Sequence, residues 1–269
     1  MKNILEIKNV SFSYESGSSI IENINLCIKE KEIVAICGKN GSGKTTLLKI
    51  FTGLLRPCTG AVFINEKNTA QMPVSEIASH IGFIMQNPDR QLFCDTVYNE
   101  AAFALKAAKI PAAEIKQRVP EALDICGLSG VQDSFPLSLS RGERAKVVIA
   151  AVLAMGPEII IFDEPAGGQD YRSIRMIMDM MLNLNKNGRT IIFVTHNMSM
   201  AAEYAGRIIV MDNKRIVTDG TPEEVFCKTE NTFINPPQIT ILSRELRKYL
   251  PLEKDALTVS ELGEMLVRG

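Results

Sequence analysis

Residues 38–45 read Gly-Lys-Asn-Gly-Ser-Gly-Lys-Thr, which fits the spacing G-x-x-x-x-G-K-[ST] at every position. The apolar run 33–37 precedes this turn, and a segment that we predict as a helix over 45–56 follows it. A loop between a strand and a helix suits phosphate, because glycines let backbone amides and the positive end of the helix face the anion. The stretch therefore predicts the phosphate-binding loop of an α/β nucleotide-binding protein.

Every residue of this turn is assigned to the nucleotide site. Lys44 is expected to reach the β- and γ-phosphates, and the Thr45 hydroxyl is expected to bind Mg²⁺, which prefers oxygen ligands. The other nucleotide-binding positions are Gly38, Lys39, Asn40, Gly41, Ser42, Gly43 and Thr46. A glycine-rich surface loop is the alternative, but the complete spacing with both flanks argues against it.

A second apolar run, residues 159–162, ends in Asp163 and Glu164. Such a run is typical of a buried parallel strand, and ligand sites form at the carboxyl ends of these strands. We expect Asp163 to hold the hydration shell of Mg²⁺ and Glu164 to polarise the water that attacks the γ-phosphate. An acidic pair at a strand end is more often a solvated rim, and the phosphate loop favours the catalytic interpretation.

The length and composition of the chain are typical of a globular protein with at most two domains. With 269 residues, 46% of them hydrophobic, the chain is long enough for one large α/β domain and a small appendage. The net charge of −1 argues against a general nucleic-acid-binding surface, so no nucleic-acid partner is expected. The longest apolar run, 147–155, is too short to cross a bilayer, so any membrane spans must come from partner proteins.

Residues 139–143, Leu-Ser-Arg-Gly-Glu, lie shortly before the second apolar run and resemble the L-S-G-G-Q signature of ATP-binding-cassette (ABC) ATPases. The resemblance covers roughly residues 3–226. It implies an α/β fold: an ABC-type P-loop ATPase core over 1–226 with an antiparallel β subdomain and a helical signature subdomain at about 87–155. A small C-terminal appendage follows over 227–269. ATP and Mg²⁺ are the implied substrate and cofactor.

The same resemblance implies roles for two aromatic positions. Tyr14 corresponds to the aromatic residue that stacks on adenine, although simple packing in a strand is the alternative. His196 corresponds to the switch histidine that contacts the γ-phosphate. A lone histidine is usually structural, but His196 follows the apolar strand 190–194 and so reaches the same sheet edge as Asp163.

Further positions are carried over in the same way. Gln86 is the implied sensor glutamine, counted as a catalytic residue and as a Mg²⁺ ligand. Asp170 is the implied aspartate of the loop at the dimer interface. Because ABC sites form between two subunits, Ser140 and Gly142 are expected to contact the nucleotide held by a partner.

Residues 85–93, Met-Gln-Asn-Pro-Asp-Arg-Gln-Leu-Phe, resemble the sensor loop of energy-coupling-factor (ECF) ATPases, which drive uptake of vitamins and transition-metal ions. The resemblance implies a homo- or heterodimer of ATPases at the cytoplasmic face of the membrane, beneath a transmembrane coupling subunit. A separate membrane protein captures the substrate. Asp89 either meets an arginine of the coupling subunit or serves turn chemistry only.

The arm that carries the signature is predicted as helices over 96–108 and 112–126, with Pro120 starting or kinking a helix. The appendage, with an amphipathic segment over 239–250, is expected to make dimer contacts as in ECF ATPases, or to pack on its own domain.

Two positions depart from the family pattern. Arg141 stands where the signature has its first glycine, and we expect its side chain to crowd the γ-phosphate of a partner subunit; the alternative is that its positive charge contacts that phosphate. Gln169 stands where leucine is common in the dimer loop.

Three classes of function are compatible with these residues. They are an ECF-type importer motor, the motor of another ABC importer or exporter, and a soluble ABC protein of DNA repair or translation. The interval 45–139 has no room for the long coiled-coil insertion expected of the third class.

Overall fold

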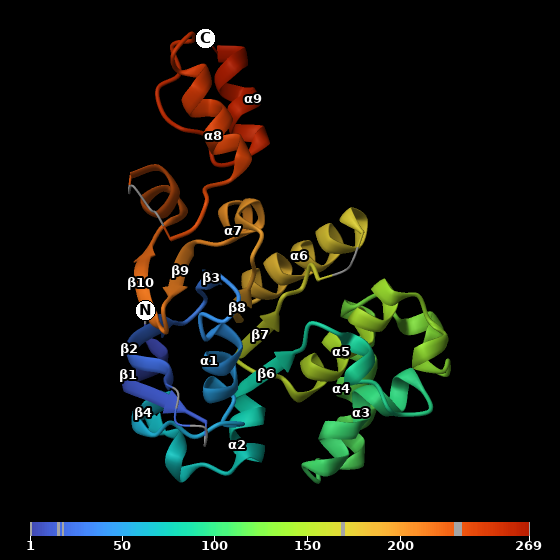
Figure 1. Cartoon of the computed structure of the whole chain (residues 1–269). Helices are drawn as coiled ribbons and strands as arrows, with labels where there is room; N and C mark the ends of the chain where they lie inside the picture. Colours follow the sequence, from blue (N-terminus) through green and yellow to red (C-terminus); the bar gives the residue numbers. More distant parts are fainter. Residues whose placement is uncertain (1, 15–16, 18, 168–169, 229–232, 269) are drawn as a thin grey trace.

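The computed structural model describes residues 2–14, 17, 19–167, 170–228 and 233–268 (Figure 1). Its larger sheet has the strand order β10-β9-β3-β8-β7-β6. The strands are β10 (Arg215–Gly220), β9 (Arg207–Asp212), β3 (Ile33–Gly38), β8 (Thr190–Val194), β7 (Ile159–Asp163) and β6 (Ile81–Ile84). All neighbours pair in parallel except β10, which is antiparallel to β9. The carboxyl ends of β3, β6, β7 and β8 therefore meet at one edge.

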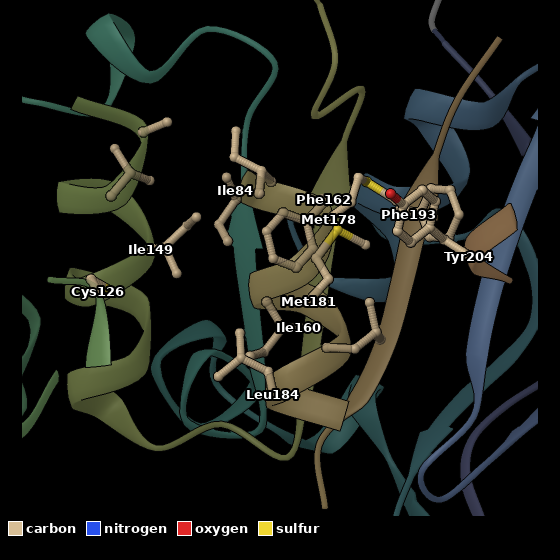
Figure 2. Packing of buried hydrophobic residues seen from close by; sticks show 14 of the residues in the cluster. Ile84, Cys126, Ile149, Ile160, Phe162, Met178, Met181, Leu184, Phe193 and Tyr204 are labelled. Carbon is tan, nitrogen blue, oxygen red and sulfur yellow. The ribbon is translucent and has the colours of Figure 1, made fainter. Parts of the chain in front are cut away.

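Both faces of the large sheet are buried, which explains why its strands read as continuous apolar runs. On β7, Ile160 and Phe162 belong to one hydrophobic cluster, while Ile159 and Ile161 belong to the other. Figure 2 shows the first cluster, where Phe162 lies close to Met178 of the helix that covers this face.

The second sheet is antiparallel, with the strand order β2-β1-β4-β5. Its strands are β2 (Ser19–Lys29), β1 (Asn3–Ser13), β4 (Thr59–Ile64) and β5 (Lys67–Asn68). Helix α1 (Lys44–Phe51) buries Leu47, Leu48 and Phe51 in the cluster shared with this sheet. The predicted α/β class with an antiparallel β subdomain is confirmed.

Helix α1 is shorter than the sequence suggested. It ends at Phe51, whereas we expected a helix over 45–56. The physical reason is Gly53, whose φ of +70° is the left-handed conformation that ends many helices. Thr52 also donates its hydroxyl proton to the Leu48 carbonyl at 3.1 Å, so the last turn is closed by a side chain.

The helices α3 (Val97–Ala107), α4 (Ala112–Ile125) and α5 (Arg141–Met155) pack against one another beyond β6 (Figure 1). Thr96 caps α3 by accepting a hydrogen bond from the Asn99 amide. Pro120 lies inside α4, so the expectation that it starts a helix is wrong; α4 begins after Pro111. The large sheet is further covered by α2 (Val74–His80), α6 (Tyr171–Lys186) and α7 (Met198–Tyr204).

The C-terminal segment carries α8 (Gln238–Leu246) and α9 (Val259–Arg268), which lie side by side at the top of Figure 1. A buried carboxylate, Asp255, accepts hydrogen bonds from Arg244 at 2.6 Å and Arg247 at 3.0 Å. Arg244 also donates to the carbonyl of Phe226, which ties the segment to the end of the core. No helix among the described residues is long and apolar enough to cross a membrane.

Candidate active site

The glycine-rich loop that we predict to bind phosphate lies between the end of β3 and the start of α1. The backbone of Gly38, Gly41 and Gly43 has positive φ values, so the loop uses conformations that other residues rarely adopt. Lys44 is buried, and its Nζ donates to the carbonyl oxygens of Gly38 at 2.8 Å and Lys39 at 2.9 Å. The loop is thus folded around its own lysine.

Ser42 provides a direct indication that this loop is shaped for an anion. Its hydroxyl is buried and has no hydrogen-bond partner among the described residues. A buried polar atom normally has a partner, because leaving it unsatisfied costs about 1–3 kcal/mol. A phosphate oxygen held by the loop would supply that partner.

Two carboxylates end β7 beside this loop. Burial, helped by the charge of Glu164, raises the pKa of Asp163, while the Lys44 ammonium opposes the shift. Burial lowers the pKa of Lys44, and the charges of Glu164, Cys37 and Asp163 act in the opposite direction. The site therefore holds a cation and two carboxylates at short range in a partly desolvated environment.

Glu164 is the centre of a small hydrogen-bonded group. Its Oε2 lies 3.0 Å from His196 Nδ1 and accepts a hydrogen bond from Gln86 Nε2 at 3.4 Å. The Glu164 backbone amide donates to the Val194 carbonyl at 3.1 Å, which fixes the residue between β7 and β8. His196 remains 67% exposed, so its ring is accessible to a ligand. The carboxylate, histidine and glutamine singled out in the sequence are thus brought together.

A pocket of about 580 Å³ opens beside this group. Its walls are Thr45, Lys49, Met85, Gln86, Asn87, Arg90, Arg141, Asp163 and Gly167. Thr45, Gln86 and Asp163, the three residues expected to bind Mg²⁺, all line this pocket. Each side chain carries an oxygen atom that can coordinate a metal ion, and Mg²⁺ prefers oxygen ligands. The residue types present therefore fit that ion.

Sequence analysis missed two cations of this pocket, Lys49 and Arg90. Lys49 follows Thr45 by four residues on α1, and this spacing places both on one face of a helix. The spacing alone could therefore have predicted that Lys49 lies beside Thr45. Arg90 comes from the short 3₁₀ helix Pro88–Arg90, and its direction follows from the fold alone.

The signature residues are arranged differently from the pocket residues. Ser140 caps α5: its hydroxyl accepts from the Glu143 amide at 3.3 Å and donates to the Glu143 carboxylate at 2.6 Å. This hydrogen bond holds the pKa of Glu143 low. Gly142 lies against α6, where a Cβ would be 3.2 Å from the Ser173 hydroxyl. Neither Ser140 nor Gly142 lines the pocket of its own chain, and their roles toward a partner's nucleotide stay predictions.

Arg141, unlike Ser140 and Gly142, lines the pocket of its own chain. Its Nη2 donates to the Gly167 carbonyl at 3.0 Å, and both residues line the pocket beside Asp163. Sequence reasoning considered this arginine only as a group that faces a partner subunit. In the single chain the guanidinium instead contacts the loop that follows Glu164.

The remaining candidates lie outside this cluster. Asp170 caps α6 by accepting from the Ser173 amide at 2.9 Å, and this bond lowers the pKa of Asp170. Tyr14 follows β1, is 43% exposed and stacks edge-on against Phe12; its adenine contact stays a prediction. Gln169 lies outside the described residues.

Asp89 was predicted either to meet a partner's arginine or to serve turn chemistry. Its amide donates to Asn87 Oδ1 at 3.1 Å, which is the expected turn hydrogen bond. Its carboxylate lies 2.9 Å from Arg144 Nε of α5. An arginine of its own chain thus contacts Asp89, and the pair links the sensor loop to the arm.

Comparison with known proteins identifies the kind of chain that carries this site. Residues 21–167 match the family model described as ABC transporter. A putative ABC transporter ATP-binding protein of Caldanaerobacter subterraneus subsp. tengcongensis is 40% identical over 93% of this chain, which spans 45% of that relative. An energy-coupling factor transporter ATP-binding protein, EcfA2, of the same organism is 38% identical over 98% of this chain and 96% of its own length.

A solved structure is also similar. The cbiO1 protein from Clostridium perfringens, described as part of the ABC transporter complex cbiONQ, has a TM-score of 0.80 and 32% sequence identity. The similarity covers 93% of this chain and 97% of that one. The chain spans about half the length of the first curated relatives it matches, and nearly the full length of the EcfA2 and cbiO1 proteins.

Proposed function

The chain belongs to the ABC transporter family of ATP-binding, ATP-hydrolysing subunits, and from this premise we propose that it is the motor of an ECF-type importer for a vitamin or a transition-metal ion. The observation that carries the hydrolytic part of the proposal is the convergence of His196 and Gln86 on Glu164 beside the Lys44 loop. Similarity to EcfA2 and cbiO1 over nearly their whole lengths supports the importer type.

Nucleotide binding follows from the arrangement of the phosphate loop. We propose that Lys44 exchanges the carbonyl oxygens of Gly38 and Lys39 for phosphate oxygens, which are stronger acceptors for an ammonium. Burial lowers the pKa of Lys44 because it disfavours the charged ammonium. An incoming polyanion would stabilise that ammonium. The buried hydroxyl of Ser42 gains its missing partner in the same step.

Thr45, Gln86 and Asp163 are proposed to hold Mg²⁺ at the pocket beside the loop. When bound, the ion neutralises charge on the phosphate oxygens. Asp163 is well suited to this position, because the burial that raises its pKa also strengthens its attraction for a cation. Thr45 and Gln86 contribute neutral oxygens, so Asp163 supplies the only negative charge among these three ligands.

Glu164 is proposed as the general base. A carboxylate that accepts hydrogen bonds from two sides is held in one orientation, and a fixed base typically contributes about 10²–10⁴ to the rate. Gln86 and His196 supply these contacts. Because His196 is largely exposed, we propose that its ring also reaches the γ-phosphate when nucleotide is present.

An apolar groove supports coupling to a membrane protein. It has a volume of about 460 Å³ and lies between α2 and β6 on one side and α3 and α5 on the other. Phe103, Leu54 and Val74 line it and are 49%, 56% and 44% exposed. We propose that a short cytoplasmic helix of a transmembrane coupling subunit fills this groove, since amphipathic helices bind such grooves through apolar anchors. A separate membrane protein would capture the substrate.

Dimerisation with a second ATPase, identical or different, completes the proposal. Ser140 and Gly142 do not line their own pocket, which leaves them available to a partner's nucleotide. The C-terminal segment also exposes apolar residues of α9, Val259, Leu266 and Val267, which we propose as dimer contacts. The assembly would lie at the cytoplasmic face of the membrane.

Two variants test the proposed hydrolytic site. Lys44→Ala is expected to abolish ATP binding by the purified chain, measured with a fluorescent ATP analogue. Glu164→Gln is expected to keep binding but to lower kcat by at least about 10². Arg118→Ala serves as the control, because Arg118 makes an exposed ion pair with Glu114 in α4, away from the site. Hydrolysis by Glu164→Gln at the parent rate would refute the assignment of the base.

A second experiment tests the transport partner. Purification of the chain from its host membranes in mild detergent is expected to recover a coupling subunit together with a small substrate-capture protein. Recovery of a single pair of large transmembrane subunits without a capture protein would instead place the chain with another class of ABC transporter.

A further inference from the structure

Arg141 is the signature residue that the proposed function leaves without a role, yet it makes a specific contact within its own chain. Its Nη2 donates to the Gly167 carbonyl at 3.0 Å, across 26 residues of sequence. Both residues line the pocket that also contains Thr45 and Asp163. The contact therefore joins the start of the arm helix α5 to the wall of the hydrolytic site.

Gly167 is in turn linked to the hydrolytic carboxylate by two routes. Its amide donates to the Glu164 carbonyl at 2.9 Å, which closes a tight turn. A Cβ on Gly167 would lie 2.9 Å from Gln86 Nε2 and 3.0 Å from Gln86 Cγ, so the glutamine side chain packs directly on the glycine backbone. Gln86 then donates to the Glu164 carboxylate at 3.4 Å. A shift of Gly167 would therefore move the backbone carbonyl of Glu164 directly and its carboxylate through Gln86.

On the other side, Arg141 is firmly attached to the arm. It is the first residue of α5, directly after the cap in which Ser140 and Glu143 bond to each other. Helix α5 packs against α3 and α4, so the arm carries Arg141 with it. The cap and the packing of α5 therefore place the Arg141 backbone beside the turn that contains Gly167.

We propose that Arg141 is a positioning residue that acts in its own chain: its guanidinium holds the Gly167 carbonyl and so keeps the turn that carries Glu164, together with Gln86, aligned with the arm. Its effect on hydrolysis rests on the proposed function, whereas the contact with Gly167 does not. The competing assignment is a contact of Arg141 with the nucleotide of a partner subunit.

The Gly167 amide offers a direct measurement, since it is protected by the turn to Glu164. Hydrogen exchange is followed by NMR on a chain labelled at its 18 glycines, without nucleotide and at concentrations where it is monomeric. Because Arg141 is exposed, we expect Arg141→Ala to speed exchange at Gly167 roughly three- to fivefold, the range for an exposed charged contact. Arg141→Lys keeps a donor of similar reach and is expected to restore most of the protection. Arg118→Ala is expected to change nothing at Gly167.

Unchanged Gly167 exchange in Arg141→Ala would overturn the proposal, as would equal acceleration in Arg118→Ala. A second readout uses turnover: Arg141→Ala is expected to lower kcat roughly three- to fivefold while the Kd for ATP of the monomer stays within twofold, and Arg141→Lys is expected to recover the rate. Loss of ATP affinity only in the dimer, with normal Gly167 exchange, would instead assign Arg141 to the partner's nucleotide.

Failure of the proposed function would be recognised separately. If the unchanged chain binds no ATP, the proposed nucleotide site is wrong, and the exchange rates at Gly167 still decide whether Arg141 holds that residue.

Discussion

Two glycines of the phosphate loop, Gly38 and Gly41, need to be glycine for different reasons, and this difference can be measured. A Cβ on Gly38 would lie 2.2 Å from the carbonyl oxygen of Met211 and 2.9 Å from the Ser42 hydroxyl. Met211 is a backbone neighbour in the sheet, where β9 pairs with β3 at this position, so it cannot move without breaking the ladder. A Cβ on Gly41 would meet nothing within 4 Å.

The expected magnitudes follow from these contacts. Gly41 has a φ of +80°, so Gly41→Ala is expected to cost only the conformational penalty of the left-handed region, about 1–2 kcal/mol. Gly38 has a φ of +151°, and Gly38→Ala adds to this penalty the cost of overpacking against backbone, about 1–3 kcal/mol. We therefore expect Gly38→Ala to be the more destabilising variant by about 1–3 kcal/mol.

Urea unfolding monitored by far-UV circular dichroism measures the difference, with both variants compared with the parent chain. A second readout is ATP binding, which is expected to fail in Gly38→Ala even below the unfolding transition, because a displaced Gly38 backbone would distort the loop that is proposed to hold the phosphates. Equal unfolding midpoints for the two variants would show that the loop relaxes around the extra methyl group, and the steric argument would be refuted.

Two further predictions concern charges. Because burial raises the pKa of Asp163, the folded chain binds this proton more tightly than the unfolded chain, so ionised Asp163 costs stability above that pKa and nothing at low pH. Asp163→Asn is thus expected to raise the Tm of the nucleotide-free chain by a few degrees at pH 7, with no gain near pH 3, while weakening Mg²⁺-dependent ATP binding; calorimetry showing a lower Tm at pH 7 would contradict this. Asp89→Lys removes the charge partner of Arg144, whose Nε is buried, and puts a like charge beside it, so we expect about 1–3 kcal/mol of destabilisation. ATP binding is expected to stay near normal while recovery of the coupling subunit falls; undiminished co-purification would exclude Asp89 from that interface.

The parts of the fold and site that the sequence predicted are those determined by local spacing. The phosphate loop is one continuous segment, so its glycines, Lys44 and Thr45 follow from a single motif. The place of Asp163 and Glu164 was predictable because a run of apolar residues is typical of a buried parallel strand, and the residues after it lie at the edge of the sheet. The end of α1 at Phe51 could also have been predicted from Gly53, because a glycine two residues after the last helical residue is typical of a helix end.

Contacts between distant side chains were not predictable in this way. Gln86 and Glu164 are 78 residues apart, and Arg141 reaches Gly167 across a loop whose path depends on how α5 and α6 pack. A long arginine has many rotamers, and sequence spacing does not select among them. The assumption that the signature faces only a partner therefore left out the contact that Arg141 makes in its own chain.

Glu164, the proposed base, has a backbone conformation that its residue type rarely adopts. Its φ is +50°, a conformation that costs a residue with a Cβ about 1–2 kcal/mol and that glycine or asparagine would adopt more readily. Neither of those residues could act as a base. The turn directs the carboxylate toward Gln86 and His196 instead of along the line of β7, and the hydrogen bonds to Val194 and Gly167 hold the backbone in place. The strained position thus coincides with the carboxylate that we propose as the base, and it is stabilised by contacts that only the complete fold provides.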